Sequence, residues 1–208
     1  MVLVAGSMSV WDERYAGDEY HFGTEPNAFL AAQINLLKPG MSCLAVADGE
    51  GRNGVWLAQQ GLDVLSVDSS YVALEKAGKL AQQRGVTAKF ELVDIASWDW
   101  GQNRFDLVAA IFIQFAPPAM RENMFAHIKR CLKPGGMLLL QGYTPRQLEF
   151  ATGGPSQAEN LYTEALLRKA FVDMEILHLR EHDDIIREGS GHSGMSALID
   201  LVARKHVV

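Results

Sequence analysis

The sequence predicts an α/β fold built on a mostly parallel sheet. Short apolar runs of strand length alternate with amphipathic stretches of helix length, a pattern typical of βαβ units. Glycine or proline punctuates most of the boundaries between them. The 208 residues contain neither a linker rich in Pro, Gly and Ser nor an internal repeat. We therefore expect residues 1–208 to form one doubly wound α/β domain.

The first five strands come from apolar runs, each followed by a break. They are expected at 43–47, 64–68, 88–93, 105–111 and 137–142. The helix after the first strand covers 54–60 and stops at Gly61. The next follows Ser69-Ser70, which offers an N-cap, and ends near Gly85. A further helix opens at Pro117-Pro118, runs through Leu132 and is closed by residues 134–136.

The pattern changes in the last third of the chain. A loop-rich stretch over 144–160 precedes a helix expected from Thr163 to about Ala170. Two strand-like runs follow, at 174–186 and 197–204, and a glycine-rich turn at 188–194 joins them. Such a turn favours a hairpin. We therefore expect seven strands, the last two of which pair antiparallel.

Composition excludes several classes of protein. The chain is 48% hydrophobic and 21% charged, which does not fit a disordered, collagenous or disulfide-stapled protein. A net charge of −6 argues against a nucleic-acid partner. No run approaches the roughly 20 apolar residues of a membrane span, and residues 1–6 are too short for a signal peptide. We expect a cytoplasmic protein with unstructured residues 1–8 and free, buried thiols at Cys43 and Cys131.

Three acidic or glycine-rich features follow the first three strands. Residues 47–54 form a glycine loop that opens a helix, where Gly49 and Gly51 allow a tight turn and a close approach to a ligand. Asp68 ends the second strand, 17 residues after Gly51, and could accept both hydroxyls of a ribose. Asp94 ends the third strand and could bind an exocyclic amine. The alternatives are an ordinary turn, a helix-capping acid and a solvated loop acid.

These features point to a nucleoside site because parallel strands end at one edge of the sheet, where such folds bind ligands. A dinucleotide carries a pyrophosphate, which Asp48 and Glu50 in the loop would repel. The terminal hairpin also argues against a dinucleotide fold. S-adenosylmethionine has no phosphate, so the sequence favours it as the ligand.

Residues 11–205 resemble the class I S-adenosylmethionine-dependent methyltransferases. The resemblance rests on six motifs, which are 47–53, 67–70, 94–95, 105–108, 132–136 and 202–205. The chain is similar to the small bacterial subgroup that includes tellurite-resistance and thiol or thiopurine methyltransferase-like proteins. The resemblance implies a Rossmann-like seven-stranded sheet of order 3-2-1-4-5-7-6 with strand 7 antiparallel.

The resemblance also implies a cofactor site. Its residues here are Arg14, Tyr20, Ala47, Asp48, Gly49, Gly51, Asp68, Ser69, Asp94, Ile95 and Ile111. Two positions depart from the family. Relatives often carry an acid at the position of Ala45 and glycine at that of Ala47. The strand acid usually helps to hold the methionine amino group, a role that Asp48 or backbone carbonyls would then take.

The aromatic segment 9–25 resembles the family's lid over cofactor and acceptor. In that role Arg14 or Tyr20 would bind the methionine carboxylate, and the rings would face the sulfonium. The alternative is that these aromatic residues simply pack an N-terminal helix on the sheet.

The candidate catalytic residues come from topology. Gln114 follows the fourth strand, beside the reacting methyl group of this fold. The tip of the hairpin should lie on the same edge, because strand 6 ends there and strand 7 begins there. His192 could then orient or deprotonate an acceptor, and Arg187 could attract an anionic one. The alternatives are a hydrogen-bonding loop residue for Gln114 and a solvated turn residue for His192.

The expected function is methyl transfer from S-adenosylmethionine to a small acceptor, such as a thiol, a metalloid oxyanion or a similar nucleophile, by in-line displacement. No His, Cys and Asp cluster has the spacing of a metal site. We expect a monomer or homodimer with no membrane or nucleic-acid partner. Two alternatives stay open, a catalytically silent cofactor-binding protein and a nicotinamide-dependent oxidoreductase.

Overall fold

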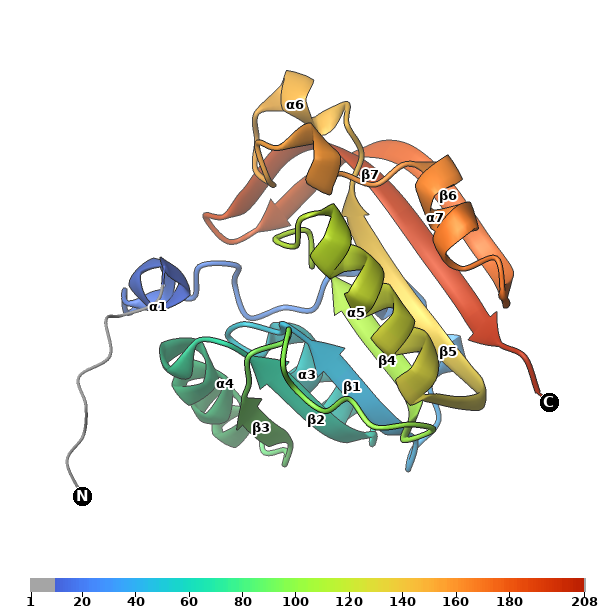
Figure 1. Cartoon of the computed structure of the whole chain (residues 1–208). Coiled ribbons are helices and arrows are strands. Elements are labelled where there is room, and N and C mark those ends of the chain that lie inside the picture. Colours follow the sequence, from blue (N-terminus) through green and yellow to red (C-terminus); the bar gives the residue numbers. More distant parts are fainter. Residues whose placement is uncertain (1–9, 208) are drawn as a thin grey trace.

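The computed structural model describes residues 10–207 and contains a seven-stranded sheet (Figure 1). The expectation for residues 1–8 lies outside the described residues. The strands are β1 (Ser42–Val46), β2 (Asp63–Asp68), β3 (Lys89–Leu92), β4 (Phe105–Ile111), β5 (Leu132–Tyr143), β6 (Met174–Glu188) and β7 (His192–Lys205). Their order is β3-β2-β1-β4-β5-β7-β6, and β7 is antiparallel to both of its neighbours. The predicted order and the antiparallel seventh strand are confirmed.

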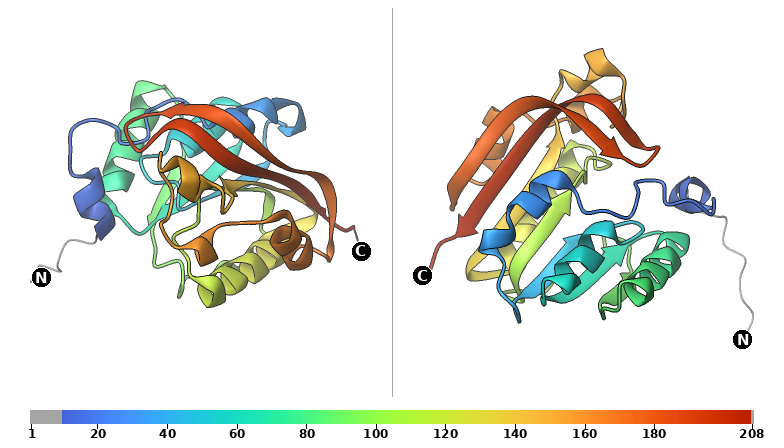
Figure 2. Two further views of the ribbon diagram at one scale, coloured as in Figure 1. Left: turned by 90° about the horizontal axis from the view of Figure 1, so that it is seen from above. Right: turned by 180° about the vertical axis from the view of Figure 1, so that it is seen from behind.

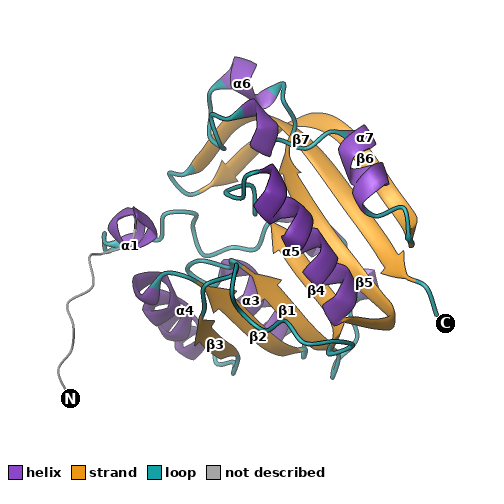
Figure 3. Ribbon diagram, viewed as in Figure 1, coloured by secondary structure: helices purple, strands orange, loops and turns teal. Residues whose placement is uncertain are grey.

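Helices cover both faces of this sheet (Figure 2). Those described are α1 (Val10–Tyr15), α2 (Ala28–Ala32), α3 (Arg52–Gln59), α4 (Tyr71–Gln83), α5 (Pro118–Cys131), α6 (Gln147–Phe150) and α7 (Glu164–Ala170). Short 3-10 turns lie at Ile34–Leu36 and Ala158–Asn160. Helices α2, α3 and α4 cover one face, and α5 and α7 cover the other (Figures 2 and 3). None of the described helices is long and apolar enough to cross a membrane.

The buried strands fill two apolar layers because alternate side chains point to opposite faces. In β1, Leu44 and Val46 pack with the layer under α5 and α7. Cys43 and Ala45 point to the other layer, with Leu57 of α3. Cys43 and Cys131 are both buried free thiols, as expected.

The C-terminal hairpin is longer than the sequence predicted. Strand pairing continues to Glu188 opposite His192, so the turn consists of residues 189–191 rather than 188–194. The predicted strand at 137–142 likewise begins earlier, at Leu132. Polar residues and glycines weaken the strand pattern in both places. Backbone hydrogen bonds to a neighbouring strand extend both strands, although their local sequence does not predict it.

Candidate active site

The glycine loop between β1 and α3 is fixed from within. Its backbone is left-handed at Ala47 (φ 48°), Gly49 (φ 56°) and Gly51 (φ 84°). Asp48 turns inward, and its Oδ2 accepts hydrogen bonds from Gly54 N at 3.0 Å and from Ser66 Oγ at 2.9 Å. Burial raises the pKa of this carboxyl to about 7. Asp48 therefore sets the shape of the loop.

Asp68 joins the end of β2 to the same loop. Its Oδ2 accepts a hydrogen bond from Gly49 N at 2.8 Å, and its Oδ1 accepts one from Ser70 N at 2.9 Å. Burial raises its pKa, against these hydrogen bonds. Each carboxylate oxygen has further acceptor capacity, so the same side chain that orients the loop can also receive ligand hydroxyls.

Aromatic residues of the N-terminal segment lie over the loop. A Cβ added to Gly49 would lie 2.8 Å from the Oη of Tyr15, so the ring covers bare backbone there. Tyr15 stacks on Trp11 with ring centroids 6.1 Å apart, and Trp11 meets Phe115 edge-on at 6.3 Å. Because Gly49 has no side chain, the Tyr15 ring can pack directly against the peptide.

A buried ion pair attaches that segment to the domain. Lys76 Nζ lies 2.7 Å from Glu50 Oε1 and also donates to Glu19 O at 2.8 Å. Glu50 Oε2 accepts a hydrogen bond from His21 N at 2.7 Å. Glu50, which the sequence suggested as a repulsive charge in the loop, is buried and holds the N-terminal segment.

The loop, the strand ends and the N-terminal segment enclose a cavity of about 710 Å³. Most of the predicted site residues line it. They are Arg14, Ala47, Asp48, Gly49, Asp68, Ser69, Asp94, Ile95, Ile111, Gln114 and His192. Asp94 is exposed and also caps its own turn, because Oδ1 accepts from Ala96 N at 3.0 Å.

Three predicted residues lie outside the cavity lining. Tyr20 donates from its hydroxyl to Lys76 O at 3.0 Å, so it attaches the N-terminal segment to α4. Gly51 serves helix packing, since a Cβ there would lie 2.5 Å from the Cβ of Ala77. Arg187 is exposed, next to the buried Glu188, because successive side chains of a strand point to opposite faces. Tyr20 and Gly51 therefore make packing contacts outside the cavity, and the Arg187 side chain is exposed on the opposite face of β6 from Glu188.

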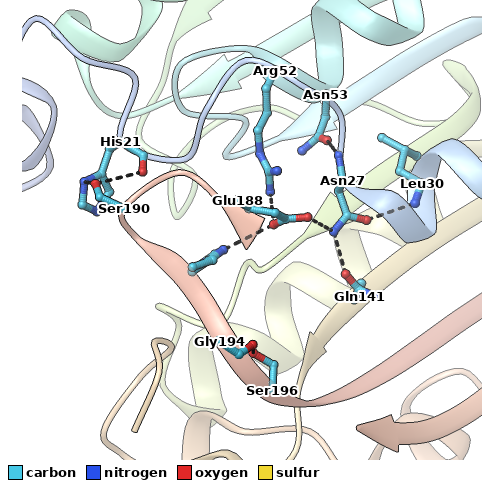
Figure 4. Close-up of polar contacts among 11 residues, drawn as sticks. His21, Asn27, Leu30, Arg52, Asn53, Gln141, Glu188, Ser190, Gly194 and Ser196 are labelled. Carbon is cyan, nitrogen blue, oxygen red and sulfur yellow. Dashed lines mark hydrogen bonds and ion pairs between the residues drawn. The ribbon is translucent and has the colours of Figure 1, made fainter. Parts of the chain in front are cut away.

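The tip of the hairpin meets the N-terminal segment at the mouth of the site (Figure 4). The N–H groups of Ser190 and Gly191 both donate to His21 O, at 2.9 and 3.0 Å. Two segments about 170 residues apart in sequence, 21 and 190, therefore touch. This places the tip at the edge where the parallel strands end, as topology predicted.

Aromatic rings surround His192 just inside that contact. Its ring centroid lies 4.4 Å from that of Phe22, 4.5 Å from that of Phe112 and 5.6 Å from that of Tyr143. Burial lowers the pKa of His192, so the imidazole is neutral at neutral pH. Phe112 has a φ of 55°, an uncommon conformation for a bulky side chain and one that marks strain at functional sites.

A buried polar cluster is centred on Glu188 (Figure 4). Arg52 Nη2 donates to Glu188 Oε2 at 2.6 Å. Asn27 Nδ2 donates to Glu188 Oε1 at 2.9 Å and to Gln141 Oε1 at 2.6 Å. His192 Nδ1 lies 3.6 Å from Glu188 Oε2. Burial opposes ionisation of Glu188, but His192 and Arg52 outweigh it and lower the pKa to about 2, so the carboxylate stays charged.

Gln114 lines the cavity, yet backbone groups occupy both ends of its amide. Nε2 donates to Tyr143 O at 2.9 Å and to Asn160 O at 3.2 Å, and Oε1 accepts from Tyr143 N at 2.6 Å. These contacts join β5 to the loop before α7. They match the alternative of a hydrogen-bonding structural residue.

Arg52 also lines the cavity, and the sequence analysis did not name it as a site residue, although its position at the start of a helix was a usable signal. It opens α3, where the helix dipole disfavours a positive charge. A cation kept at that position indicates a compensating partner or ligand. Across residues 10–207 no group of three or more His, Cys, Asp or Glu side chains is arranged to hold a metal ion.

Part of the chain matches a known protein family. Residues 43–136 match the family model described as a methyltransferase domain. An uncharacterized methyltransferase of Synechocystis is 30% identical over 105 residues, which cover 50% of this chain and 48% of that protein. The chain thus aligns with about half the length of this curated relative.

Solved structures share the fold. A protein from Methanosarcina mazei described as a SAM-dependent methyltransferase superposes with a TM-score of 0.68 at 20% identity, covering 88% of this chain and 100% of that one. TehB from Haemophilus influenzae gives 0.69 at 17% identity, covering 94% and 65%. The matched segment and the shared fold support the resemblance to class I S-adenosylmethionine-dependent methyltransferases.

Proposed function

We propose that this protein transfers a methyl group from S-adenosylmethionine to a small nucleophile. The observation that carries the proposal is the convergence of the glycine loop, Asp68 and Asp94 on one 710 Å³ cavity. The spare acceptor capacity of Asp68 fits the hydroxyls of a nucleoside. Asp48 lines the cavity too, but its Oδ2 is turned inward to Gly54 N and Ser66 Oγ.

The cofactor would be held by residues of the strand ends. Asp68 is placed to accept ribose hydroxyls, and Asp94 with Ile95 to bound the adenine. Arg14, exposed at the mouth and 4.7 Å from the Trp11 ring centroid, is the cation for the methionine carboxylate. When bound, S-adenosylmethionine supplies a methyl group that its sulfonium already activates. The protein therefore contributes position and exclusion of water.

The ring-lined half of the cavity would receive the acceptor. Its walls, Phe22, Phe112 and Tyr143, exclude water from the reacting atoms. His192 is the candidate base: its Nδ1 faces Glu188, which leaves Nε2 for an acceptor proton. The acceptor classes we test first are thiols, which need little base because their reference pKa is about 8.5, and metalloid oxyanions.

Two measurements test the proposal. Calorimetry should show binding of S-adenosylhomocysteine, and labelled methyl donor should yield a methylated product from thiols, metalloid oxyanions or small metabolites. His192→Ala should lower turnover at least tenfold and leave S-adenosylhomocysteine affinity nearly unchanged. Wild-type turnover should rise as pH increases through the lowered pKa of His192 and level off by neutrality. A variant with wild-type turnover and pH profile would remove His192 from catalysis.

A second candidate function is a catalytically silent S-adenosylmethionine-binding protein. Ala45, at the position where relatives often have an acid, favours it. Asp48 Oδ2 already accepts hydrogen bonds from Gly54 N and Ser66 Oγ, so only its Oδ1 is free to contact the methionine amino group in place of the missing acid. Tight binding of the cofactor with no product from any acceptor class would support this candidate.

A further inference from the structure

The acceptor half of the cavity differs in charge from the cofactor half. Among the described lining residues the carboxylates are Asp48, Asp68 and Asp94, and all three belong to the glycine loop and the ends of β2 and β3. The arginines of the lining are Arg14 and Arg52, and Arg52 shares Glu188 with the ring-surrounded His192. Its partner Glu188 contacts it from behind and lines a separate, smaller cavity of about 240 Å³ with Asn27.

The guanidinium of Arg52 has one nitrogen that is paired and one that is buried without a partner. Nη2 is bound to Glu188 at 2.6 Å, while Nη1 is buried without a hydrogen-bond partner in the described chain. The whole residue is 6% exposed. A buried donor without a partner is costly, so a site that keeps one generally supplies a ligand atom to receive it.

Two other buried polar atoms without hydrogen-bond partners among the described residues belong to the lining of the same cavity. They are Tyr143 Oη and Asn160 Oδ1, whereas Tyr162 Oη, which also has no partner, belongs to a residue outside the lining. Phe22 and Phe112 supply apolar walls beside them. The lining therefore combines a fixed cation, aromatic surfaces and a few polar atoms.

Glu188 makes Arg52 a rigid receptor. Its two oxygens are held by Arg52 Nη2, by Asn27 Nδ2 and by the proximity of His192 Nδ1 at 3.6 Å. Asn27 is itself fixed by Gln141 Oε1 at 2.6 Å, and its backbone N–H donates to Asn53 Oδ1 at 2.9 Å. A guanidinium locked in this way loses little freedom when it binds an oxyanion, and anionic oxygens are its best partners.

We infer that Arg52, positioned by Glu188, binds a carboxylate of the methyl acceptor, so that the substrate is a small organic acid whose apolar body rests on the rings of Phe22, Phe112 and Tyr143. The identification of the bound acid as a methyl acceptor rests on the proposed function, but acid binding itself is testable without methyl transfer. It replaces the exposed Arg187, which the sequence suggested, with a buried arginine that lines the cavity.

The test measures binding to protein saturated with S-adenosylhomocysteine. Benzoate and benzamide have nearly the same shape and differ in charge, and acetate has the carboxylate without the apolar body. Calorimetry should show benzoate binding at least tenfold more tightly than either. Equal affinity for benzoate and benzamide overturns the carboxylate site, and equal affinity for benzoate and acetate overturns the role of the rings.

The variants assign the preference to one arginine. Arg52→Gln combined with Glu188→Gln removes both charges together, so neither is left buried alone, and it should abolish the preference for benzoate over benzamide. Arg52→Lys keeps the charge but loses the forked donor, and it should reduce the preference several-fold even if the double variant fails to fold. Arg187→Gln should retain it. Persistence in the Arg52 variants, or loss in Arg187→Gln, overturns the inference.

The outcomes also separate this inference from the proposed function. If S-adenosylhomocysteine does not bind, the proposed function fails, and the benzoate titration without it still tests the Arg52 site. If S-adenosylhomocysteine binds and benzoate shows no preference, the proposed function stands and the acid-binding site fails. Thermal unfolding of each variant confirms that a lost preference is not lost structure.

Discussion

The two halves of the cavity are built in different ways. The cofactor half comes from the ends of β1, β2 and β3, and its acids are held by neighbouring backbone, as Asp68 is by Gly49 and Ser70. The acceptor half is assembled from segments that are distant in sequence, where His21 touches Ser190 and Arg52 pairs with Glu188. The first half has a local sequence pattern, and the second exists only after the sheet and hairpin have formed.

This difference has a functional consequence. A site made by strand ends inherits the rigidity of the sheet and suits a ligand that does not change. A site made by a hairpin tip and an N-terminal segment can change its walls without altering the sheet. Variation of the second half alone can give one fold many acceptors.

The largest expected effect lies in the cofactor half. Asp68→Ala removes a charged acceptor from two ribose hydroxyls and releases Gly49 N. We expect a loss of about 1.5–3 kcal/mol in S-adenosylhomocysteine binding, roughly ten- to hundred-fold in affinity. Calorimetry measures this loss of affinity. The Asp68→Asn variant keeps the size of the side chain and removes its charge, so it shows how much of the loss is due to the charge. Unchanged affinity in a folded variant would show that the strand end does not bind the cofactor.

A smaller effect, confined to the acceptor half, is expected from Gly189→Ala. Gly189 has a φ of +64°, and a Cβ there would overlap the backbone of His21 and Gly23. The variant should lower acceptor turnover about tenfold and speed hydrogen exchange in the N-terminal segment, with S-adenosylhomocysteine affinity within about twofold of wild type. Gly78→Ala in α4 meets no atom within 4 Å and is the matched control. Wild-type turnover and exchange would mean that the contact is dispensable.

Burial of Asp48 in the glycine loop should lower the stability of the folded protein in a way that depends on pH. Asp48 has a pKa of about 7 when folded and an ordinary value of 3.8. Between these values the folded state binds more protons than the unfolded state, so the free energy of unfolding falls as pH rises from about 4 to 7 and then levels off. Asp48→Asn should flatten that fall by on the order of 1 kcal/mol or more.

Urea unfolding at several pH values measures this difference. Asp18→Asn, at an exposed position, is the control and should keep the wild-type slope. The raised pKa of Asp68 acts in the same direction and leaves a residual slope in both proteins. An unaltered slope in Asp48→Asn would place the titration elsewhere.

The smallest effect concerns the backbone at the end of β1. Ala47 is left-handed at φ 48°, a conformation that disfavours a side chain. Ala47→Gly should raise the free energy of unfolding by up to about 1 kcal/mol, because relief of strain exceeds the added entropy of the unfolded chain. The same substitution at the buried, extended Ala45 should lower it. If both variants lose stability alike, strain at Ala47 is not significant.

Prediction from sequence succeeded where the pattern is local. The alternation of strands and helices, the end of β2 at Asp68 and the turn that makes the hairpin could all be read from neighbouring residues. Gly51 lies outside the cavity lining, and the sequence could not show this because close packing against Ala77 of α4 and close approach to a ligand both require glycine. Tyr20 also lies outside the lining, and an aromatic residue in a lid has the same local sequence as one attached to a helix.

The sequence by itself determined the α/β class, the resemblance to class I methyltransferases and the places of Asp68 and Asp94 at the ends of two strands. Strand periodicity and the conformational freedom of glycine act over a few neighbouring residues, so they can be recognised from the sequence alone. The tertiary structure alone decided which arginine lines the cavity. Alternation along β6 buries Glu188 and exposes Arg187, and the buried carboxylate needs a cation, which only the folded chain brings to it as Arg52 at 2.6 Å.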